Sequence, residues 1–326
     1  MLAPSAFLTS AAATLPLQEA ILSPTKQSSN NYEDLAITES LKVWHTMTDA
    51  KEPLDTCRHV QRAWDEQIVD TAFQRLLSTQ SLPVDQARLK AVSDTHTGDW
   101  LNALPLTAIG LRLSDEDIRV AVAYRLGAIA CQPHICECGS LVDARGLHGL
   151  SCRKSAARQS RHSQLNDIIW RAVKRAQVPA SKEPLGLSRT DGKRPDGATL
   201  IPWARGKPLA WDVTVPDTYA ASHLERTSRI AGAAAEIAAT NKMNKYITLM
   251  STHHFVPIAI ETGGAWCPAA IEFIQDLGRK ITEVTDDPME TTYLFQRISI
   301  AIQRGNSLAF HNAFASCSNN FSPTVP

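Results

Sequence analysis

The chain has 326 residues, more than the ~250 at which a single hydrophobic core usually stops growing, so we expect at least two packed units. Lysine plus arginine and aspartate plus glutamate each number 33, so the net charge identifies no class of partner. No apolar run approaches the ~20 residues of a membrane-spanning helix. The N-terminal stretch MLAPSAFLTSAAATLPL lacks the basic segment of a signal peptide. The sequence therefore predicts an intracellular protein that does not enter a membrane.

The charges are distributed unevenly along the chain. Residues 131–215 carry 14 basic and 7 acidic side chains, whereas residues 1–130 carry 11 basic and 16 acidic ones. A local basic excess is expected where a polyanion binds. From charge alone, a solvated surface without a ligand is an equally good interpretation.

Residues 36–128 have the pattern of amphipathic helices. Within residues 59–80, apolar side chains recur near the 3.6-residue period; they are Val60, Trp64, Ile68, Phe73 and Leu76. Further along, Ser114 and Asp117 have the spacing of a capping box, and Gly127 is a suitable helix stop. The first 35 residues, rich in Ala, Ser and Pro, are expected to be partly disordered or part of a larger helical unit.

From residue 159 the pattern changes to helices and strands in mixed order. The predicted strands are residues 181–187, 196–202, 208–215 and 255–262. The predicted helices are residues 161–177, 223–250, 269–284 and 290–310. This order indicates a compact mixed α/β unit. Neither GxGxxG nor GxxxxGK[ST] is present, so nucleotide binding has no support in the sequence.

Four of the seven cysteines fall within twenty-two residues, in CQPHICECGSLVDARGLHGLSC. In a reducing compartment such a cluster indicates a metal site before disulfides. The ligands that this stretch predicts for a tetrahedral Zn²⁺ are Cys136, Cys138, His148 and Cys152. Such a site would be closed and structural.

The spacing leaves this ligand set open. One residue separates the first two thiols in place of the usual two, so Cys131 or His134 is an alternative first ligand. Gly139 and Gly149 would allow the backbone to fold around the ion. The other interpretation is that the cysteines are ordinary small buried residues.

Two aspartates, Asp196 in RPDG and Asp212 in AWDVTV, begin consecutive predicted strands. Antiparallel pairing through the connection PWARGK would place the two carboxylates on adjacent strands. Neighbouring carboxylates repel unless a cation neutralises them, and Mg²⁺ prefers such oxygen ligands. Water on that ion could attack a phosphodiester, with Lys242 and Lys245 adding positive charge. The alternative is a surface turn that contains Asp196 in a Pro-Asp-Gly sequence.

An ordered set of motifs resembles a known family. RPDG followed by AWDVTV resembles the PD-(D/E)XK nuclease superfamily. The CxC and HxxxC pairs, RHSQLND, KEP, NKMNKY and FVPIAIETGGAW occur with it in an order similar to the C-terminal restriction-like endonuclease region of non-LTR retrotransposon proteins. The similarity extends from about residue 131 to residue 305. Upstream, the stretch with WLNALP and RLG resembles the segment that follows the polymerase domain of such proteins.

The resemblance implies the fold class and the division of the chain. The fold is expected to be α/β (α+β), with a nuclease core built on a central mixed sheet flanked by helices. Residues 1–128 would form a helical, thumb-like domain, residues 129–158 a zinc-binding motif, and residues 159–326 the restriction-like endonuclease domain. No YxDD motif occurs, so we expect no reverse transcriptase active site in the chain and a truncated or domesticated copy of the element's protein.

The resemblance also implies roles for individual residues. Asp196 and Asp212 match the pair of acids that binds the catalytic metal ion. Glu183 matches an acid at the end of the first strand, which would contact the metal or its water. The residues expected to contact nucleic-acid phosphates are Arg161, His162, Lys193, Arg194, Arg153, Lys154 and Arg158.

One position departs from the family pattern. The superfamily's lysine would stand two residues after the second acid, where this chain has Thr214. Related nucleases carry the lysine on the following helix, so we expect Lys245, with Lys242 as second choice, to supply it.

The sequence thus predicts a nuclear, Mg²⁺-dependent endonuclease that nicks DNA by phosphodiester hydrolysis. The expected cofactors are catalytic Mg²⁺ and structural Zn²⁺. The expected partners are DNA, the element's RNA and a reverse transcriptase polypeptide supplied in trans. The alternatives are a nucleic-acid-binding remnant that no longer cleaves and a truncated product without function.

Overall fold

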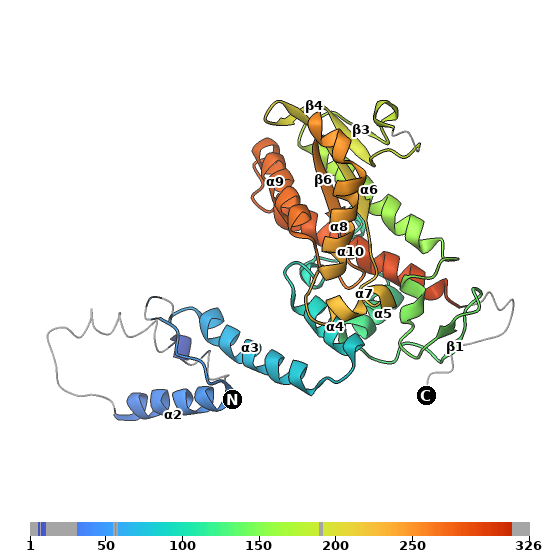
Figure 1. Cartoon of the computed structure of the whole chain (residues 1–326). Coiled ribbons are helices and arrows are strands. Elements are labelled where there is room, and N and C mark those ends of the chain that lie inside the picture. The colour runs from blue at the N-terminus through green and yellow to red at the C-terminus, as the bar shows by residue number, and fades with distance from the viewer. Residues whose placement is uncertain are drawn as a thin grey trace. The chain divides into compact units, whose positions relative to one another are not determined.

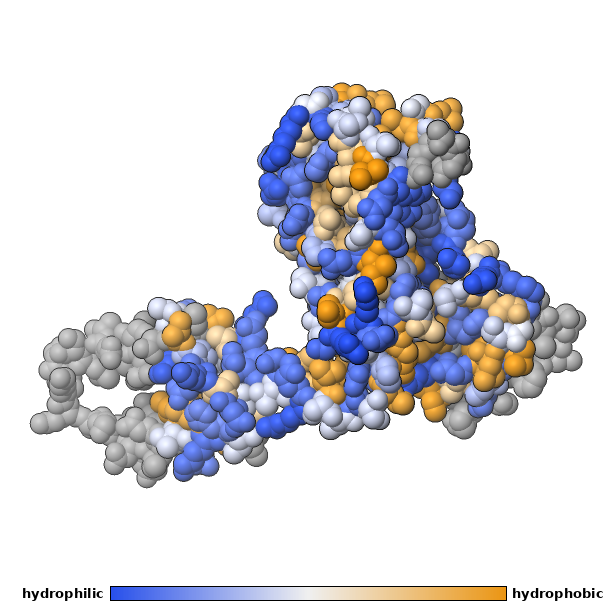
Figure 2. All heavy atoms as spheres, viewed as in Figure 1, coloured by the Kyte–Doolittle hydropathy of each residue, from blue (hydrophilic) through white to orange (hydrophobic). Residues whose placement is uncertain are grey.

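The structure, a computed structural model, describes residues 6, 8–10, 31–54, 56, 58–188 and 192–314. Most of the first 35 residues, together with Cys57 and Cys317, lie outside these ranges. The chain divides into two units, residues 1–81 and residues 82–326. No helix in the described ranges combines the length and the apolar character needed to cross a membrane. On the face seen in Figure 2, hydrophobic residues form separate patches among hydrophilic ones.

Within the described residues of the first unit lie the helices α2 (Asn31–Met47) and α3 (Gln61–Thr79), so the helix predicted over residues 59–80 is confirmed. Two buried tryptophans, Trp44 and Trp64, join the helices with their rings edge to face and their centroids 5.3 Å apart. The Trp44 indole N–H also donates a hydrogen bond of 3.2 Å to the carbonyl oxygen of Trp64. Two side chains predicted on the same apolar face are exposed instead: Val60 and Leu76.

Helix α5 (Asp115–Leu126) begins and ends where the sequence predicted. The Ser114 hydroxyl accepts a hydrogen bond of 3.1 Å from the Asp117 N–H, and the Asp117 carboxylate accepts one of 3.1 Å from the Ser114 N–H. This capping box satisfies two N–H groups that the helix itself leaves unpaired. At the other end Gly127 has a φ of 72°, a left-handed conformation that favours glycine.

The second unit begins at residue 82. Residues 82–128 belong to the second unit, where α4 (Pro83–Ser93) packs against α7 (Ala221–Thr227) and α5 packs against α10 (Glu290–His311). The apolar cluster that anchors this segment consists of Trp100, Leu111, Leu113, Ala121 and Ile300.

A four-stranded sheet forms the centre of the second unit (Figure 1). Its strands in spatial order are β3 (Ala180–Lys182), β4 (Gly197–Ala204), β5 (Lys207–Thr214) and β6 (His254–Ala259). The first three pair antiparallel and the last two pair parallel, so the sheet is mixed. Helix α6 (Ala157–Arg175) precedes the sheet, and α8 (Ala233–Lys245) lies in the crossover from β5 to β6. The predicted mixture of helices with a mixed sheet is confirmed.

Helices cover both faces of β5. Three of its side chains join the apolar core formed with α6, α9 (Pro268–Thr285) and α10: Leu209, Trp211 and Val213. Ala210 points to the opposite face, as alternate strand residues do, and packs in a cluster with Tyr246 just after α8. A strand buried on both faces reads as an almost continuous apolar run, which explains the sequence PLAWDVTV.

The single helix predicted over residues 223–250 is wrong. The structure has α7, then α8, and then a 3-10 turn over Ile247–Ser251. Gly232 separates α7 from α8 with a φ of 72°, and a Cβ there would lie 2.9 Å from the Trp266 carbonyl oxygen. The alanine-rich composition favours helix throughout, but this close approach interrupts it.

Candidate active site and metal centre

The predicted Cys/His cluster comes together in a small two-stranded element. Strands β1 (His134–Ile135) and β2 (Leu141–Val142) pair antiparallel, and the turn between them carries the first two cysteines. The ligand atoms of the four predicted residues all lie within 4.8 Å of one another: Cys136, Cys138, His148 and Cys152. The Sγ atoms of Cys136 and Cys152 are 3.7 Å apart, and Cys138 Sγ lies 3.1 Å from the His148 ring nitrogen Nε2. This cluster could hold a metal ion.

The two alternative ligands have other partners. The Cys131 thiol donates a hydrogen bond of 3.4 Å to the Asp143 carbonyl oxygen. The His134 ring nitrogens lie 2.9 Å from the Gln132 carbonyl oxygen and 3.1 Å from that of Ala313. The structure therefore favours the ligand set that the sequence suggested first.

Glycines shape the cluster in two different ways. Gly139, in the turn after Cys138, has a φ of 86°, so the predicted backbone freedom is used there. Gly149 does not have a positive φ; a Cβ at this position would lie 2.6 Å from the Ala309 carbonyl oxygen. Gly149 therefore permits close packing of the Cys/His cluster against α10.

The pKa values of the Cys138 and Cys136 thiols are shifted in opposite directions. Hydrogen bonds from the Ser140 side chain and backbone lower the pKa of the Cys138 thiol to about 6. Burial raises the pKa of the Cys136 thiol. A thiolate is the form of cysteine that ligates metal, so Cys138 is the ligand best prepared for binding at neutral pH.

The two aspartates lie side by side at the start of β4 and near the end of β5. The Asp196 N–H donates to the Trp211 carbonyl oxygen over 2.9 Å, which continues the antiparallel pairing by one residue beyond Gly197. The hairpin turn is shorter than the predicted PWARGK connection, because Arg205 and Gly206 alone form it with φ values of 50° and 74°. Adjacent placement of the two acids, as the sequence predicted, is confirmed.

The Asp196 carboxylate is held from two elements. Its Oδ2 accepts a hydrogen bond of 2.6 Å from the Val213 N–H on β5 and lies 3.0 Å from the His162 ring nitrogen Nε2 on α6. The Asp196 carbonyl oxygen accepts a further bond of 3.2 Å from the Asn166 side-chain amide. One carboxylate oxygen of Asp196 is thus oriented by the sheet and by the helix that precedes it.

The Asp212 side chain, 3% exposed, is surrounded by groups from the end of α8. The Lys242 ammonium forms an ion pair with Asp212 Oδ2, and the Lys245 ammonium lies 3.9 Å from Oδ1. The Tyr246 hydroxyl is 2.9 Å from the same Oδ1, and it accepts a hydrogen bond of 2.7 Å from Lys245. Both predicted lysines therefore reach the second aspartate, with Lys242 closer than Lys245, the reverse of the predicted order.

The Asp196 carboxylate shifts the pKa values of two neighbouring groups. Burial and the adjacent charge of Asp196 raise the pKa of Asp212, although Lys242 and Tyr246 oppose the shift. The hydrogen bond to Asp196 raises the pKa of His162, against the effect of burial. Two acids that repel in a partly buried place are a common feature of sites that bind a cation.

Glu183 stands at the third acidic position of the nuclease pattern, and Thr214 stands where that pattern has its lysine. The Glu183 N–H donates to the Asp196 carbonyl oxygen over 2.9 Å, but its carboxylate forms an ion pair with Arg194. In this structure Glu183 therefore adjoins the site through its backbone. Thr214 ends β5 without a basic side chain, and the lysines at the end of α8 approach Asp212 instead.

The structure corrects the prediction that Arg161 contacts a nucleic-acid phosphate. Its side chain is 2% exposed, and its guanidinium donates to the Asn306 side-chain oxygen over 2.7 Å and to the Leu150 carbonyl oxygen over 3.2 Å. Burial lowers the pKa of Arg161 to about 10. The side chain joins α6 to α10 and to the segment of the Cys/His cluster, so it is not at the surface where a nucleic acid could contact it.

The other predicted basic residues lie nearer the surface. Arg153, Arg158 and Lys193 are exposed, and the Lys154 ammonium donates to the Glu137 carbonyl oxygen over 2.9 Å. His162 is about one-third exposed, with its side chain at 31%. These positions remain compatible with the predicted contacts.

Sequence reasoning missed two residues of the site, Asn166 and Tyr246. Asn166 also accepts a hydrogen bond of 2.9 Å from the Trp211 indole N–H, so it connects α6 to both strands. Each stands four residues after a predicted site residue, His162 or Lys242, on the same side of a helical turn. That spacing is the signal that would have identified them.

No protein-family model matches the chain, and a comparison with curated proteins finds no match.

Proposed function

We infer that the protein is a metal-dependent endonuclease that nicks DNA at the Asp196–Asp212 pair. The observation that carries this proposal is the meeting of two carboxylates at adjacent strands with two lysine ammonium groups from α8. The motif order that resembles the nuclease region of non-LTR retrotransposon proteins supports it. So does the succession of one helix, three strands, two helices and one strand around the sheet.

The donors fit a hard divalent cation such as Mg²⁺. Among the described residues, only the Cys/His cluster brings three or more Cys, His, Asp or Glu ligand atoms close enough together to share one ion. The aspartate pair would thus offer only carboxylate oxygens and leave other positions to water and phosphate, as Mg²⁺ sites usually do. When bound there, Mg²⁺ would lower the pKa of its water and offset charge on the phosphate.

The protein's own residues position the reacting groups. The Val213 N–H and His162 hold one oxygen of Asp196, which leaves the other available for a ligand. Lys242 and Lys245 place positive charge where a phosphate would sit beside Asp212. Such preorganised charge stabilises the negative charge that develops during phosphodiester hydrolysis.

Exposed cations in the basic part of the chain would hold the DNA backbone. Arg153, Arg158 and Lys193 are exposed and lie in the basic part of the chain. Contacts of this kind give binding that weakens steeply with salt. A nuclear location, binding of the element's RNA and action beside a reverse transcriptase in trans belong to the same proposal.

Zinc is the ion that best suits the Cys/His cluster. Zn–S bonds of ~2.3 Å in tetrahedral geometry place two sulfurs roughly 3.8 Å apart, close to the 3.7 Å between Cys136 and Cys152. Four protein ligands leave no position for substrate, so the role would be structural.

A plasmid-nicking assay with the full chain in Mg²⁺ tests the proposal. Wild-type protein should convert supercoiled plasmid to the open circular form, and Asp196→Asn and Asp212→Asn should abolish the conversion. Asp276→Asn, which removes a carboxylate from α9, serves as the matched control and should cut like wild type. Equal cutting by all four proteins would mean that the activity comes from elsewhere.

Binding without cleavage is the second candidate function. Thr214 at the family's lysine position and the Lys242 ion pair on Asp212 favour it. A gel shift that weakens with salt, without nicking in Mg²⁺ or Mn²⁺, would select this function over the nuclease.

A further inference from the structure

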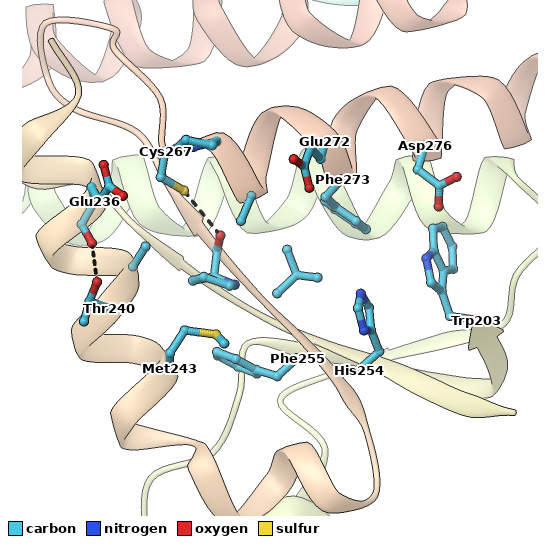
Figure 3. A pocket seen from close by; sticks show the side chains of 15 residues that line it. Trp203, Glu236, Thr240, Met243, His254, Phe255, Cys267, Glu272, Phe273 and Asp276 are labelled. Carbon is cyan, nitrogen blue, oxygen red and sulfur yellow. Dashed lines mark hydrogen bonds between the residues drawn. The ribbon is translucent and has the colours of Figure 1, made fainter. Parts of the chain in front are cut away.

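A groove lies beside β6, between α8 and α9, at the open edge of the sheet. The cavity has a volume of about 510 Å³. Trp203, Met243, Phe255 and Phe273 give it apolar walls from four different elements (Figure 3). Pockets of ~300–1,000 Å³ with apolar walls and a few polar groups are typical ligand sites.

The charged groups of this groove are acidic. Glu236 on α8 and Glu272 on α9 are exposed, and neither carboxylate has an ion pair within the described part of the chain. Asp276 also lines the groove and pairs with Arg279 over 2.9 Å. Unpaired carboxylates repel a phosphate backbone and attract a cation.

Helix α8 separates this groove from the aspartate pair. Glu236, Thr240 and Met243 recur at helical spacings of four and three residues, so they lie on one side of α8 and line the groove. Lys242 and Lys245 lie on another side of the same helix and reach Asp212. The helix thus presents two lysines toward the proposed DNA site and one acid, Glu236, toward the groove.

The outer edge of β6 is poorly suited to pairing with an added strand. Its outward-facing Ala259 carbonyl oxygen already accepts a hydrogen bond of 3.0 Å from the Cys267 N–H. Pro257 has no N–H to donate, and its carbonyl oxygen lies 3.7 Å from the Cys267 thiol. A proline in this position blunts the edge of a sheet. The groove therefore offers side-chain contacts in place of main-chain pairing.

We propose that the groove docks a segment of another polypeptide, one that presents a large apolar side chain beside a lysine or arginine. The apolar walls would take the first side chain, and Glu236 with Glu272 would hold the cation. A polypeptide bound there would lie on the side of α8 away from the lysines at Asp212. This docking is additional to the proposed DNA nicking and does not depend on it.

The test is a selection of short random peptides displayed on phage, with the full chain as bait, followed by fluorescence anisotropy with the enriched peptides. The expected peptides combine an aromatic or long aliphatic residue with Lys or Arg. Glu272→Lys, at an exposed position, and Thr240→Trp, which fills the groove, should each weaken binding by roughly tenfold or more. Glu283→Lys makes the same charge change on α9 outside the lining residues and should bind like wild type.

Three results would overturn the proposal. The first is enrichment of peptides that bind wild type, Glu272→Lys and Thr240→Trp equally well. The second is weaker binding of a DNA oligonucleotide by Thr240→Trp, which would make the groove a nucleic-acid surface. The third is self-association that Thr240→Trp abolishes, which would make the occupant a second copy. Because peptide binding is measured without Mg²⁺, an inactive aspartate site leaves this result unaffected.

Discussion

The Lys242 ammonium forms an ion pair with Asp212 Oδ2, an oxygen of the proposed metal-binding pair. A side-chain cation therefore already neutralises part of the charge of this buried acid. Two cations at one carboxylate repel each other, so Lys242 would oppose the binding of a divalent ion at Asp212.

The ion pair leads to the prediction that Lys242→Ala binds Mg²⁺ more tightly than wild type. Removal of the competing charge should lower the dissociation constant about tenfold, or ~1.4 kcal/mol. Titration calorimetry with Mg²⁺ measures it, and nicking should slow because positive charge beside the phosphate is lost.

Arg112→Ala removes an exposed cation from another part of the second unit and is the control for net charge. Unchanged or weaker Mg²⁺ binding by Lys242→Ala would contradict the competition. Absence of binding by every variant would instead count against the metal site itself.

The Cys/His cluster predicts one zinc ion per chain and a specific pattern of substitutions. Cys152→Ser should lose the ion and unfold at lower temperature, because a structural zinc contributes directly to folding. Cys131→Ser should keep the ion, since the Cys131 thiol bonds to the Asp143 carbonyl oxygen outside the cluster. Elemental analysis and thermal unfolding of both variants provide the measurements; zinc loss from Cys131→Ser would reinstate the alternative ligand.

Because Arg161 is buried, we expect its substitution to lower the stability of the fold and not to remove a contact with DNA. Arg161→Ala leaves two buried acceptors, the Asn306 side chain and the Leu150 carbonyl, without their donor. The free energy of unfolding should fall by ~2–5 kcal/mol, as expected when a buried, hydrogen-bonded charge is removed.

Arg158→Ala is the matched comparison for Arg161, because Arg158 is exposed on the same helix. It should leave urea unfolding unchanged and reduce the salt dependence of DNA binding by about one phosphate contact. A stable Arg161→Ala protein with that reduced salt dependence would restore Arg161 as a phosphate ligand.

The ion pair between Arg145 and Asp85 predicts how stability depends on pH. Burial favours a higher pKa for Asp85, but hydrogen bonds and charges from Arg145 and Arg88 outweigh it and lower the pKa. The Arg145 guanidinium contacts both carboxylate oxygens of Asp85 at 3.0 Å and so joins α4 to the segment of the metal cluster.

A lowered pKa means that the ionised Asp85 stabilises the fold above the usual aspartate pKa of about 3.9. That stabilisation is lost as the pH falls through the lower pKa of the folded protein. Urea unfolding from neutral pH down to about pH 3 should show a smaller loss for Asp85→Asn than for wild type. Parallel curves for the two proteins would show that the pair contributes nothing.

Local chemistry determined much of this protein in advance. The capping box at Ser114 depends on residues three positions apart, and the Cys/His ligands lie within one short stretch, so neither needs distant information. The adjacency of Asp196 and Asp212 follows from two strands joined by a short hairpin. The mixture of helices and strands after residue 159 was predictable for the same reason, although the break at Gly232 was not.

The tertiary structure alone decided which lysine pairs with Asp212 and that Arg161 is buried. Each depends on how a helix is rotated against a distant element. The start of α8 at Gly232 is set by the approach of the Trp266 backbone, and Arg161 is enclosed by α10, which lies more than a hundred residues further along the chain. Helical periodicity specifies which side chains share a face, but only packing between distant segments specifies what that face contacts.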